Sequence, residues 1–163
     1  MPYTQLFYHL VWATKERAPL ITPRVRPMLY GFIRAKAVGL GGTVFAIGGV
    51  EDHVHIVTSV PPRIALAMFI GQVKGVASAK VNREGILGDI RFSWQEEYGA
   101  FSFDRKRLPY VVAYVEQQEE HHAQRRTIRV LERVNDVEDA MLREDAPDYV
   151  PDYEAWLIEM NAL

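Results

Sequence analysis

The 163-residue chain contains no cysteine, so disulfides, thiolate metal ligands and a cysteine nucleophile are all excluded. It also lacks an uninterrupted apolar run of about 18 residues, which is the length that a membrane-spanning helix needs. Its N-terminal residues show no basic stretch followed by an apolar run and a small-residue cleavage site, the pattern of a secretory signal. These absences predict a cytoplasmic protein that has no membrane partner.

With 48% hydrophobic and 25% charged residues, the chain is suited to form one compact domain with a core of its own. The net charge of −2 conceals an asymmetry, because residues 1–131 carry 17 Lys and Arg against 11 Asp and Glu, whereas residues 132–163 carry 2 against 10. The first part could therefore present a basic surface to phosphate groups. We expect residues 1–131 to be the functional domain and residues 132–163 to be an acidic helical extension of it.

Hydrophobic periodicity divides the first 125 residues into strands and helices. Period-two patterns predict strands at 3–13, 43–50, 53–60 and 98–103, with further strand-like material at 92–94. Helical spacing of apolar residues predicts one helix that begins near Thr22-Pro23, one over 63–82 and one from Tyr110 to about Arg125. Lys74 and Lys80 fall beside the apolar stripe of the second helix, where each could contact a ligand or water.

This order of elements predicts an α+β fold of the ferredoxin-like or RRM-like type, in which an antiparallel sheet carries two helices on one face. The open face of such a sheet is a common platform for single-stranded nucleic acid. The third helix lies outside this basic unit, where it could cross the sheet or contact a partner. We expect it to be an added, catalytic helix because of the residues that it carries.

The triplet His53-Val54-His55 lies in the third predicted strand. Side chains alternate across a strand, so His53 and His55 point to the same face. Neutral imidazole nitrogens bind divalent ions well, and two of them on one rigid strand form half of a metal site. Taken alone, the pattern is more typical of two polar residues on the solvent face of a strand.

The third predicted helix supplies residues that could complete this site. Tyr114 and Gln118 are four residues apart, a spacing that places two side chains on one helix face. We therefore predict a divalent ion bound by His53, His55 and Gln118, with the Tyr114 hydroxyl beside it. All three ligands are neutral, so the ion would keep its full charge for polarising a phosphate oxygen. Other residues that a rotated helix could bring to the ion are Gln117, Glu119 and His122.

Tyr114 is predicted to be the nucleophile. A phenol with a pKa of about 10 needs a cation or a base to remove its proton before it attacks. Attack on a DNA phosphodiester would form a phosphotyrosine that stores the bond energy for later rejoining, so no ATP is needed. The absence of a Gly-x-x-x-x-Gly-Lys loop agrees with this chemistry. Tyr110, one turn earlier, is the alternative nucleophile and is otherwise a packing residue.

Four motifs occur in order along residues 3–131. They are Tyr8-His-Leu-Val-Trp-Ala-Thr-Lys15, Asp52-His-Val-His-Ile-Val57, Trp94-Gln-Glu-Glu-Tyr-Gly-Ala-Phe-Ser102 and Tyr114-Val-Glu-Gln-Gln-Glu-Glu-His-His122. Together they resemble the HUH single-tyrosine transposases, which are small insertion-sequence transposases and their domesticated, repeat-associated relatives. The acidic segment from Glu132 onward lies outside the shared pattern.

The resemblance implies that His53, His55 and Gln118 hold Mg²⁺ or Mn²⁺, and that Tyr114 becomes joined to a DNA 5′ phosphate while a 3′ hydroxyl is released. It also implies an obligate homodimer that recognises imperfect hairpins in single-stranded DNA, and in which the tyrosine helix of one chain can complete the site of the other. The expected function is a DNA transposase, a single-strand endonuclease that nicks and rejoins hairpin-bearing DNA.

Basic residues and histidines near these motifs are predicted to contact DNA. They are Lys15, Arg105, Lys106, Arg107, His121, His122, Arg125 and Arg126. Two other functions remain open for the same residues. A non-catalytic module of this fold would bind nucleic acid without needing a metal, and a metal-dependent phosphodiesterase would use an ion-bound water in place of Tyr114.

Overall fold

The computed structural model describes residues 2–123, together with Glu132 and Val134. In this part of the chain, four strands form one antiparallel sheet in the order β2-β3-β1-β4. The strands are β1 (Phe7–Ala13), β2 (Val44–Gly49), β3 (His53–Ser59) and β4 (Gly99–Phe103). The helices are α1 (Arg26–Gly39), α2 (Leu66–Glu84), α3 (Leu108–Glu116) and α4 (Gln118–Ala123), and two 3-10 turns are η1 (Lys15–Arg17) and η2 (Arg105–Arg107).

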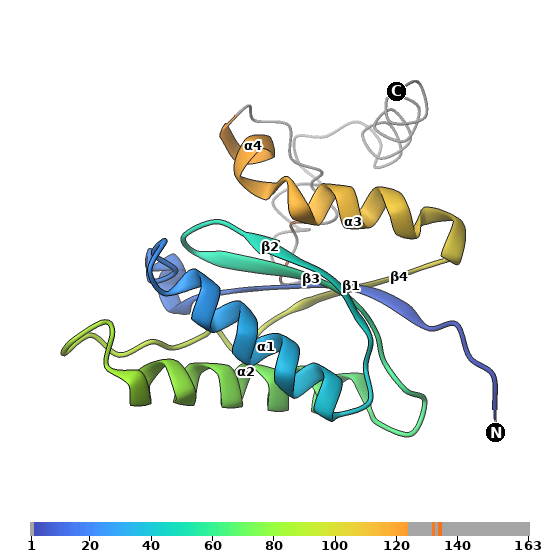
Figure 1. Cartoon of the computed structure of the whole chain (residues 1–163), viewed down its shortest axis with the longest axis horizontal. Coiled ribbons are helices and arrows are strands. Elements are labelled where there is room, and N and C mark those ends of the chain that lie inside the picture. The colour runs from blue at the N-terminus through green and yellow to red at the C-terminus, as the bar shows by residue number, and fades with distance from the viewer. Residues whose placement is uncertain (1, 124–131, 133, 135–163) are drawn as a thin grey trace, which may run out of the picture.

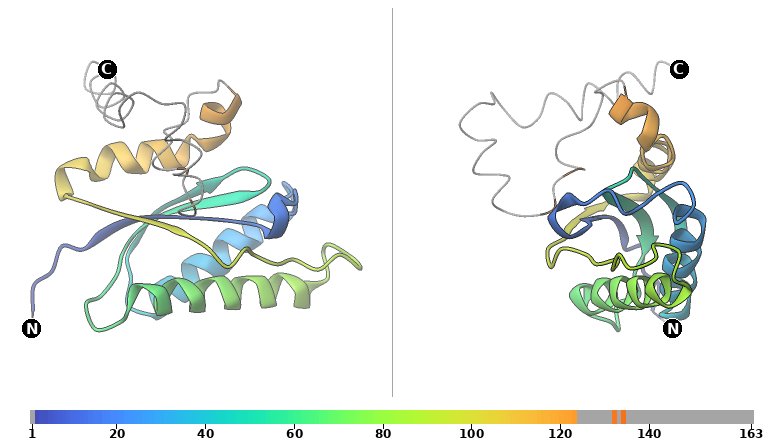
Figure 2. Two further views of the ribbon diagram at one scale, coloured as in Figure 1. Left: turned by 180° about the vertical axis from the view of Figure 1, so that it is seen from behind. Right: turned by 90° about the vertical axis from the view of Figure 1, so that its left-hand side faces the viewer.

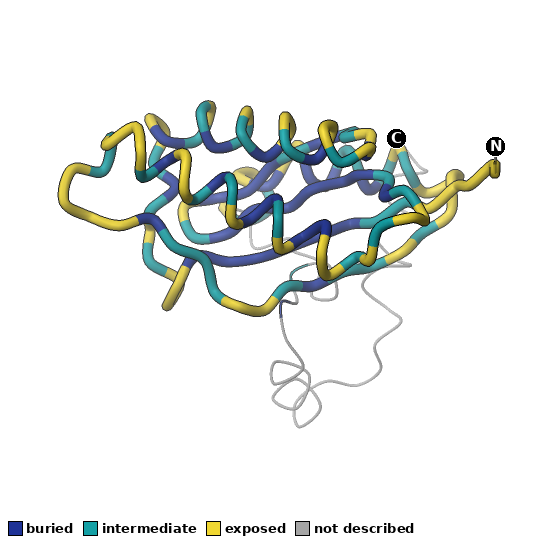
Figure 3. Tube along the Cα trace, turned by 90° about the horizontal axis from the view of Figure 1, so that it is seen from below, coloured by how far each residue is buried: buried dark blue, intermediate teal, exposed yellow. Residues whose placement is uncertain are grey.

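The helices α1 and α2 cover one face of the sheet, and α3 lies on the other (Figure 1; Figure 2). Alternate residues of the two central strands point towards α1 and α2, where they form the main hydrophobic core. These strand residues are Leu10, Trp12, Val54 and Ile56. The central strands are buried along most of their length, whereas exposed residues recur on the outer sides of the helices (Figure 3).

The second face of the sheet is covered by α3 through a smaller core. The residues in contact there are Ala46, Val57, Val111, Tyr114 and Val115. Gly48 permits the close approach of the helix, because a Cβ atom at this position would lie 1.8 Å from the backbone oxygen of Val115. The face that the sequence suggested as an open platform for nucleic acid is therefore occupied by α3 over these strands.

The predicted fold class is confirmed, since the antiparallel α+β sheet carries two helices on one face and is followed by an added helix. Two predicted boundaries are wrong. The first strand begins at Phe7 and not at residue 3. The predicted third helix is divided, because α3 ends at Glu116 and Gln117, with φ −105° and ψ 25°, separates it from α4. Tyr114 and Gln118 consequently belong to two helices and do not share the face of one.

Most of the predicted acidic helical extension at 132–163 lies outside the described residues. The division into a functional domain and an acidic extension therefore stays a prediction. Within the ranges that the structure describes, no helix combines the length and the apolar character that crossing a bilayer requires.

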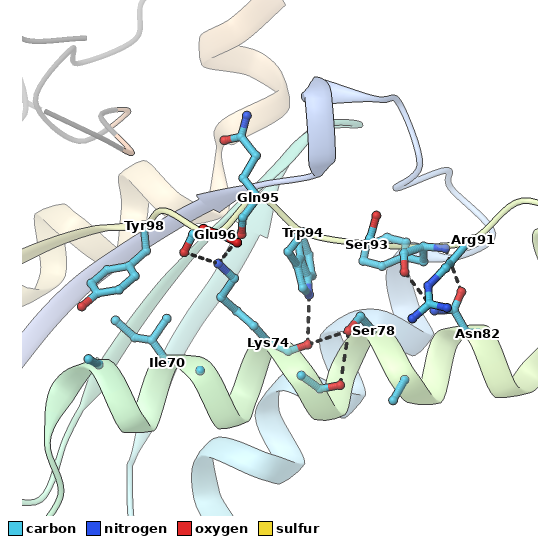
Figure 4. Close-up of a pocket in the computed structure, with 15 residues that line it drawn as sticks. Ile70, Lys74, Ser78, Asn82, Arg91, Ser93, Trp94, Gln95, Glu96 and Tyr98 are labelled. Atoms are coloured by element: carbon cyan, nitrogen blue, oxygen red, sulfur yellow. Dashed lines mark hydrogen bonds between the residues drawn. The ribbon is translucent and has the colours of Figure 1, made fainter. Parts of the chain in front are cut away.

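Lys74 of α2 is buried, although the sequence placed it beside the apolar stripe. Its Nζ donates to the backbone oxygens of Gln95, Glu96 and Glu97 at 2.6, 3.2 and 3.2 Å. Figure 4 shows this ammonium group pointing from α2 towards the segment that precedes β4. Burial lowers the pKa of Lys74 to about 8, against the opposing effect of Glu97 and Glu96, so the amine is mostly charged at neutral pH. Lys74 thus ties the segment before β4 to the helix layer.

Replacing Lys74 with methionine is expected to destabilise the protein by about 1–3 kcal/mol, because three carbonyl groups lose a charged donor. Urea unfolding followed by circular dichroism would measure the loss. Lys80→Met is the matched control, since Lys80 is exposed on the same helix and its Nζ lies 5.5 Å from the centre of the Phe32 ring. Equal stability of the two variants would contradict the structural role of Lys74.

Candidate active site

His53 and His55 lie on β3 and face α3, as the alternation of the strand predicts. In register, His53 pairs with Ala13 of β1 and His55 pairs with Val11. Their exposed fractions are only 3% and 0%. The pair therefore does not lie on a solvent-facing surface of the sheet, and buried imidazoles of this kind need partners for their nitrogens.

Each imidazole is held through its Nδ1 atom. His53 Nδ1 lies 2.6 Å from Asp52 Oδ1, and His55 Nδ1 lies 2.8 Å from His9 Nε2. Such outer contacts fix the tautomer and the orientation of metal-binding histidines. They turn the two Nε2 atoms towards one point, because these atoms lie 3.1 and 3.0 Å from the same oxygen, Oε2 of Glu132.

Glu132 and His122 complete a cluster with this histidine pair. One donor atom from each of the four residues can be chosen so that all four atoms lie within 4.8 Å of one another, an arrangement that could hold a metal ion. His122 Nε2 is 3.5 Å from Glu132 Oε2, and the His122 ring lies 4.8 Å from the ring of His53. We call these four residues the histidine–glutamate cluster.

Tyr114 is fully buried beside the histidine–glutamate cluster. Its Oη donates a hydrogen bond of 2.5 Å to Glu132 Oε1, and its ring centre lies 6.0 Å from that of His55. The ring of His121 stacks on it at 4.8 Å with an interplanar angle of 25°. Within one chain, the phenol and the imidazole pair are therefore joined through a single carboxylate. Tyr110, the alternative nucleophile, is a partly buried side chain of the smaller core.

The buried charges of the site shift the pKa values of its histidines and of Glu132 in different directions. Burial lowers the pKa of His53, but the carboxylates of Asp52 and Glu132 outweigh this effect and raise it to about 9. Burial lowers the pKa of His55 and holds that of His9 well below its usual value. Burial would raise the pKa of Glu132, but nearby imidazoles, above all His55, hold it far below its usual range. Glu132 is thus ionised and His55 is neutral, whereas His53 is protonated at neutral pH and would have to lose its proton before it could bind an ion.

Gln118 begins α4 and is almost fully buried. Its Nε2 donates to the backbone oxygen of Tyr114 at 3.1 Å, and its Oε1 is buried without a hydrogen-bond partner. The surface pocket that it lines includes Gly48 and Gly49, but neither His53 nor His55. Coordination of an ion by Gln118 therefore stays a prediction. Of the alternative ligands, Gln117 lines the same pocket and Glu119 forms an ion pair with Arg26, whereas His122 lies in the cluster.

The predicted DNA-contacting residues lie at different places on the molecule. Lys15 is exposed just after β1, at the end of the sheet where Ala13 pairs with His53. The basic turn η2 is exposed at the opposite end, because it follows β4 where Phe103 pairs with Phe7. Its Arg105, Lys106 and Arg107 are therefore about 20 Å from the histidine pair, given about 3.3 Å per strand residue. Arg107 also forms an ion pair of 3.1 Å with Asp104.

The remaining predicted DNA contacts divide into two groups. His122 belongs to the histidine–glutamate cluster, and the ring of His121 stacks on that of Tyr114 beside the cluster. Arg125 and Arg126 lie outside the described residues. A role in DNA binding stays a prediction for every member of the set.

Three residues of the site were not singled out from the sequence. Counting alternate positions back from Val11 would have placed His9 on the same face as the histidine pair, and Asp52 directly precedes His53. No motif or spacing in the sequence points to Glu132. It lies 18 residues beyond Tyr114, in a segment that the sequence distinguishes only by its negative charge. Only the tertiary contacts show that it belongs to the site.

The fold and site define an α+β protein whose antiparallel sheet gathers buried imidazoles and a carboxylate that could hold a metal ion, with a buried tyrosine beside them. The chain belongs to the IS200-like transposase family, whose model matches residues 2–118. The matched region contains His53, His55 and Tyr114 and ends at Gln118, so that His122 and Glu132 lie beyond it.

Curated relatives carry the same family identity. The ISDra2 transposase TnpA of Deinococcus radiodurans is 31% identical over 77 residues, which cover 47% of this chain and 55% of that protein. The transposase of insertion sequence element IS200 from Salmonella typhimurium is 24% identical over 88 residues, or 54% of this chain and 57% of that protein. The chain thus spans little more than half the length of the curated relatives it matches.

Two solved structures share the fold. A candidate transposase from Deinococcus radiodurans R1 superposes with a TM-score of 0.56 at 22% identity, covering 72% of this chain and 95% of that one. A REP-associated tyrosine transposase bound to a REP hairpin superposes with a TM-score of 0.51 at 15% identity, covering 71% of this chain and 70% of that one. At these identities, the likeness establishes the fold alone.

Proposed function

We propose that the chain is a DNA transposase that nicks and rejoins hairpin-bearing single-stranded DNA through a 5′-phosphotyrosine on Tyr114. One observation carries the proposal: in a member of the IS200-like family, Tyr114 Oη is joined through one carboxylate to the Nε2 atoms of His53 and His55. The relative that was solved with a REP hairpin supports hairpin DNA as the substrate class. We also propose that the chain acts as a homodimer, as the family resemblance implies.

The chain's own residues account for the proposed chemical step. As the bond between Tyr114 Oη and phosphorus forms, the bond from phosphorus to the 3′ oxygen breaks. Tyr114 Oη donates a hydrogen bond to Glu132 Oε1, so this carboxylate oxygen is positioned to accept the phenol proton. The proton is then available to the departing 3′ oxygen, which leaves as a hydroxyl. Rejoining is the same step in reverse with a second 3′ hydroxyl.

The residues present fit the divalent ion that the family implies. His53 Nε2 and His122 Nε2 are buried beside the carboxylate of Glu132, at 3.1 and 3.5 Å, so that nitrogen donors and an anionic oxygen suited to a divalent ion lie together. His53 and His55 would hold the ion, with Gln118 as the third ligand that the family resemblance implies. When bound, Mg²⁺ or Mn²⁺ would supply positive charge to the non-bridging oxygens of the phosphate under attack.

The proposal is tested by incubating the full chain with end-labelled single-stranded hairpin oligonucleotides of varied flanking sequence and Mn²⁺. A denaturing gel should show a protein-linked DNA band and a shorter fragment with a free 3′ hydroxyl. Binding without any linked band across the panel would contradict the proposal and favour a non-catalytic module. Cleavage without a linked band would indicate a phosphodiesterase that uses an ion-bound water.

Removing divalent ions is expected to stop adduct formation, because the imidazole pair has no other role in the proposed step than to hold the ion. EDTA should abolish the linked band, and added Mg²⁺ or Mn²⁺ should restore it, as measured on the same gels. A gel-shift assay with the same hairpins in EDTA is the control, since DNA binding through basic residues needs no metal. An undiminished linked band in EDTA would rule out metal dependence.

A further inference from the structure

We propose that Glu132 and His122 are ligands of the metal centre, with His53 and His55, and that Glu132 couples this centre to the Tyr114 nucleophile. The inference rests on the proposed function for its context, but it concerns metal binding, which can be measured without DNA. Both added ligands lie beyond the residues that the family model matches. They would make the centre of this chain richer in nitrogen and more negative than the three neutral ligands predicted from the sequence.

The spacing of the four donor atoms supports this ligand set. Glu132 Oε2 lies 3.0 Å from His55 Nε2, 3.1 Å from His53 Nε2 and 3.5 Å from His122 Nε2. Ligands placed about 2.1 Å from one ion have neighbours roughly 3 Å away, so these separations are those expected of donors that share a cation. The maximum separation of 4.8 Å within the cluster leaves space for a single ion.

The hydrogen bonding of the same atoms leads to the same ligand set. His53 contacts Asp52 through Nδ1, so its Nε2 is the nitrogen that faces the cluster. That Nε2 atom and the Nε2 of His122 are buried, and each lies beside Glu132 Oε2, at 3.1 and 3.5 Å, without a well-aligned hydrogen bond. Buried polar atoms in native proteins are nearly always satisfied, and a cation between the nitrogens and the carboxylate would satisfy all of them.

Glu132 occupies a special place because its two oxygens face different partners. Oε2 faces the three imidazoles, whereas Oε1 accepts the hydrogen bond from Tyr114 Oη. The carboxylate would therefore join the nucleophile to the residues that hold the ion.

The experiment measures Mn²⁺ binding to the metal-free full chain by the loss of the free-ion EPR signal, in the absence of DNA. Glu132→Gln is expected to weaken binding by at least about 10-fold, because an anionic ligand becomes a neutral amide of nearly the same shape. Glu84→Gln is the matched control, since Glu84 is exposed at the end of α2. Unchanged Mn²⁺ binding by Glu132→Gln would overturn the inference. Tighter binding would also overturn it, because the carboxylate and the ion would then be competing for the same histidine nitrogens.

A second measurement keeps the test decisive if Glu132→Gln folds poorly. Pulsed EPR of the Mn²⁺-loaded wild type counts the coordinated imidazole nitrogens, and the proposal expects three. His122→Gln should reduce the number to two, whereas two in the wild type would overturn the role of His122. None of these outcomes depends on whether the wild type forms a DNA adduct.

Discussion

Replacing Tyr114 with phenylalanine is expected to reduce the covalent protein–DNA adduct by roughly 10⁴-fold or more, because the proposed nucleophilic oxygen is removed. The ring remains and can still pack against His121 and the smaller core, so the fold should survive. Loss of the hydrogen bond to Glu132 should cost about 1 kcal/mol of stability. Denaturing gels with labelled hairpin DNA measure the adduct, and thermal unfolding checks the fold.

Tyr110→Phe is the matched control for this variant, since Tyr110 lies one turn earlier on α3 and loses the same hydroxyl group. It should form the adduct at close to the wild-type rate. If Tyr110→Phe abolished the adduct and Tyr114→Phe retained it, the two roles would have to be exchanged. If both variants still cleaved DNA, neither phenol would be the nucleophile and a phosphodiesterase mechanism would gain support.

Replacing Gly48 with alanine is expected to have the largest effect on the fold around the site. The new Cβ would lie 1.8 Å from the backbone oxygen of Val115 and 2.8 Å from its carbonyl carbon, so α3 must move away from the sheet. Overpacking of this kind typically costs about 1–3 kcal/mol. A shift of about 1 Å in Tyr114 could also slow adduct formation by about 100-fold. Urea unfolding and the adduct assay measure the two effects.

Gly31→Ala is the control for this change. Gly31 lies within α1, and a Cβ atom there would meet nothing within 4 Å. Alanine favours a helix over glycine by up to about 1 kcal/mol, so this variant should be as stable as the wild type or more so. Equal behaviour of the two alanine variants would mean that α3 does not depend on close contact with Gly48.

The cluster changes how the acidic C-terminal part of the chain should be regarded. Residues 132–163 were distinguished in the sequence only by their charge. Glu132 belongs to that segment and yet contacts the histidine pair and Tyr114. A carboxylate at this position is therefore part of the site geometry, while the division of the chain at residue 131 stays a prediction.

The sequence by itself determined the features that depend on local periodicity. Alternation along the strand placed His53 and His55 on one face, and the order of strands and helices determined the antiparallel α+β fold. Motifs in that order also indicated the family, which the family model then established. These properties are encoded locally, because side-chain direction in a strand or a helix follows from position alone.

Only the tertiary structure decided which residues meet at the site. It showed that Gln117 interrupts the predicted third helix, that α3 covers the second face of the sheet, and that His9 and Asp52 orient the histidine pair. It also brought Glu132 to Tyr114 and the imidazoles. Contacts between distant segments depend on how helices and strands pack against one another. A periodic pattern describes only local structure, so it does not predict which distant residues come into contact.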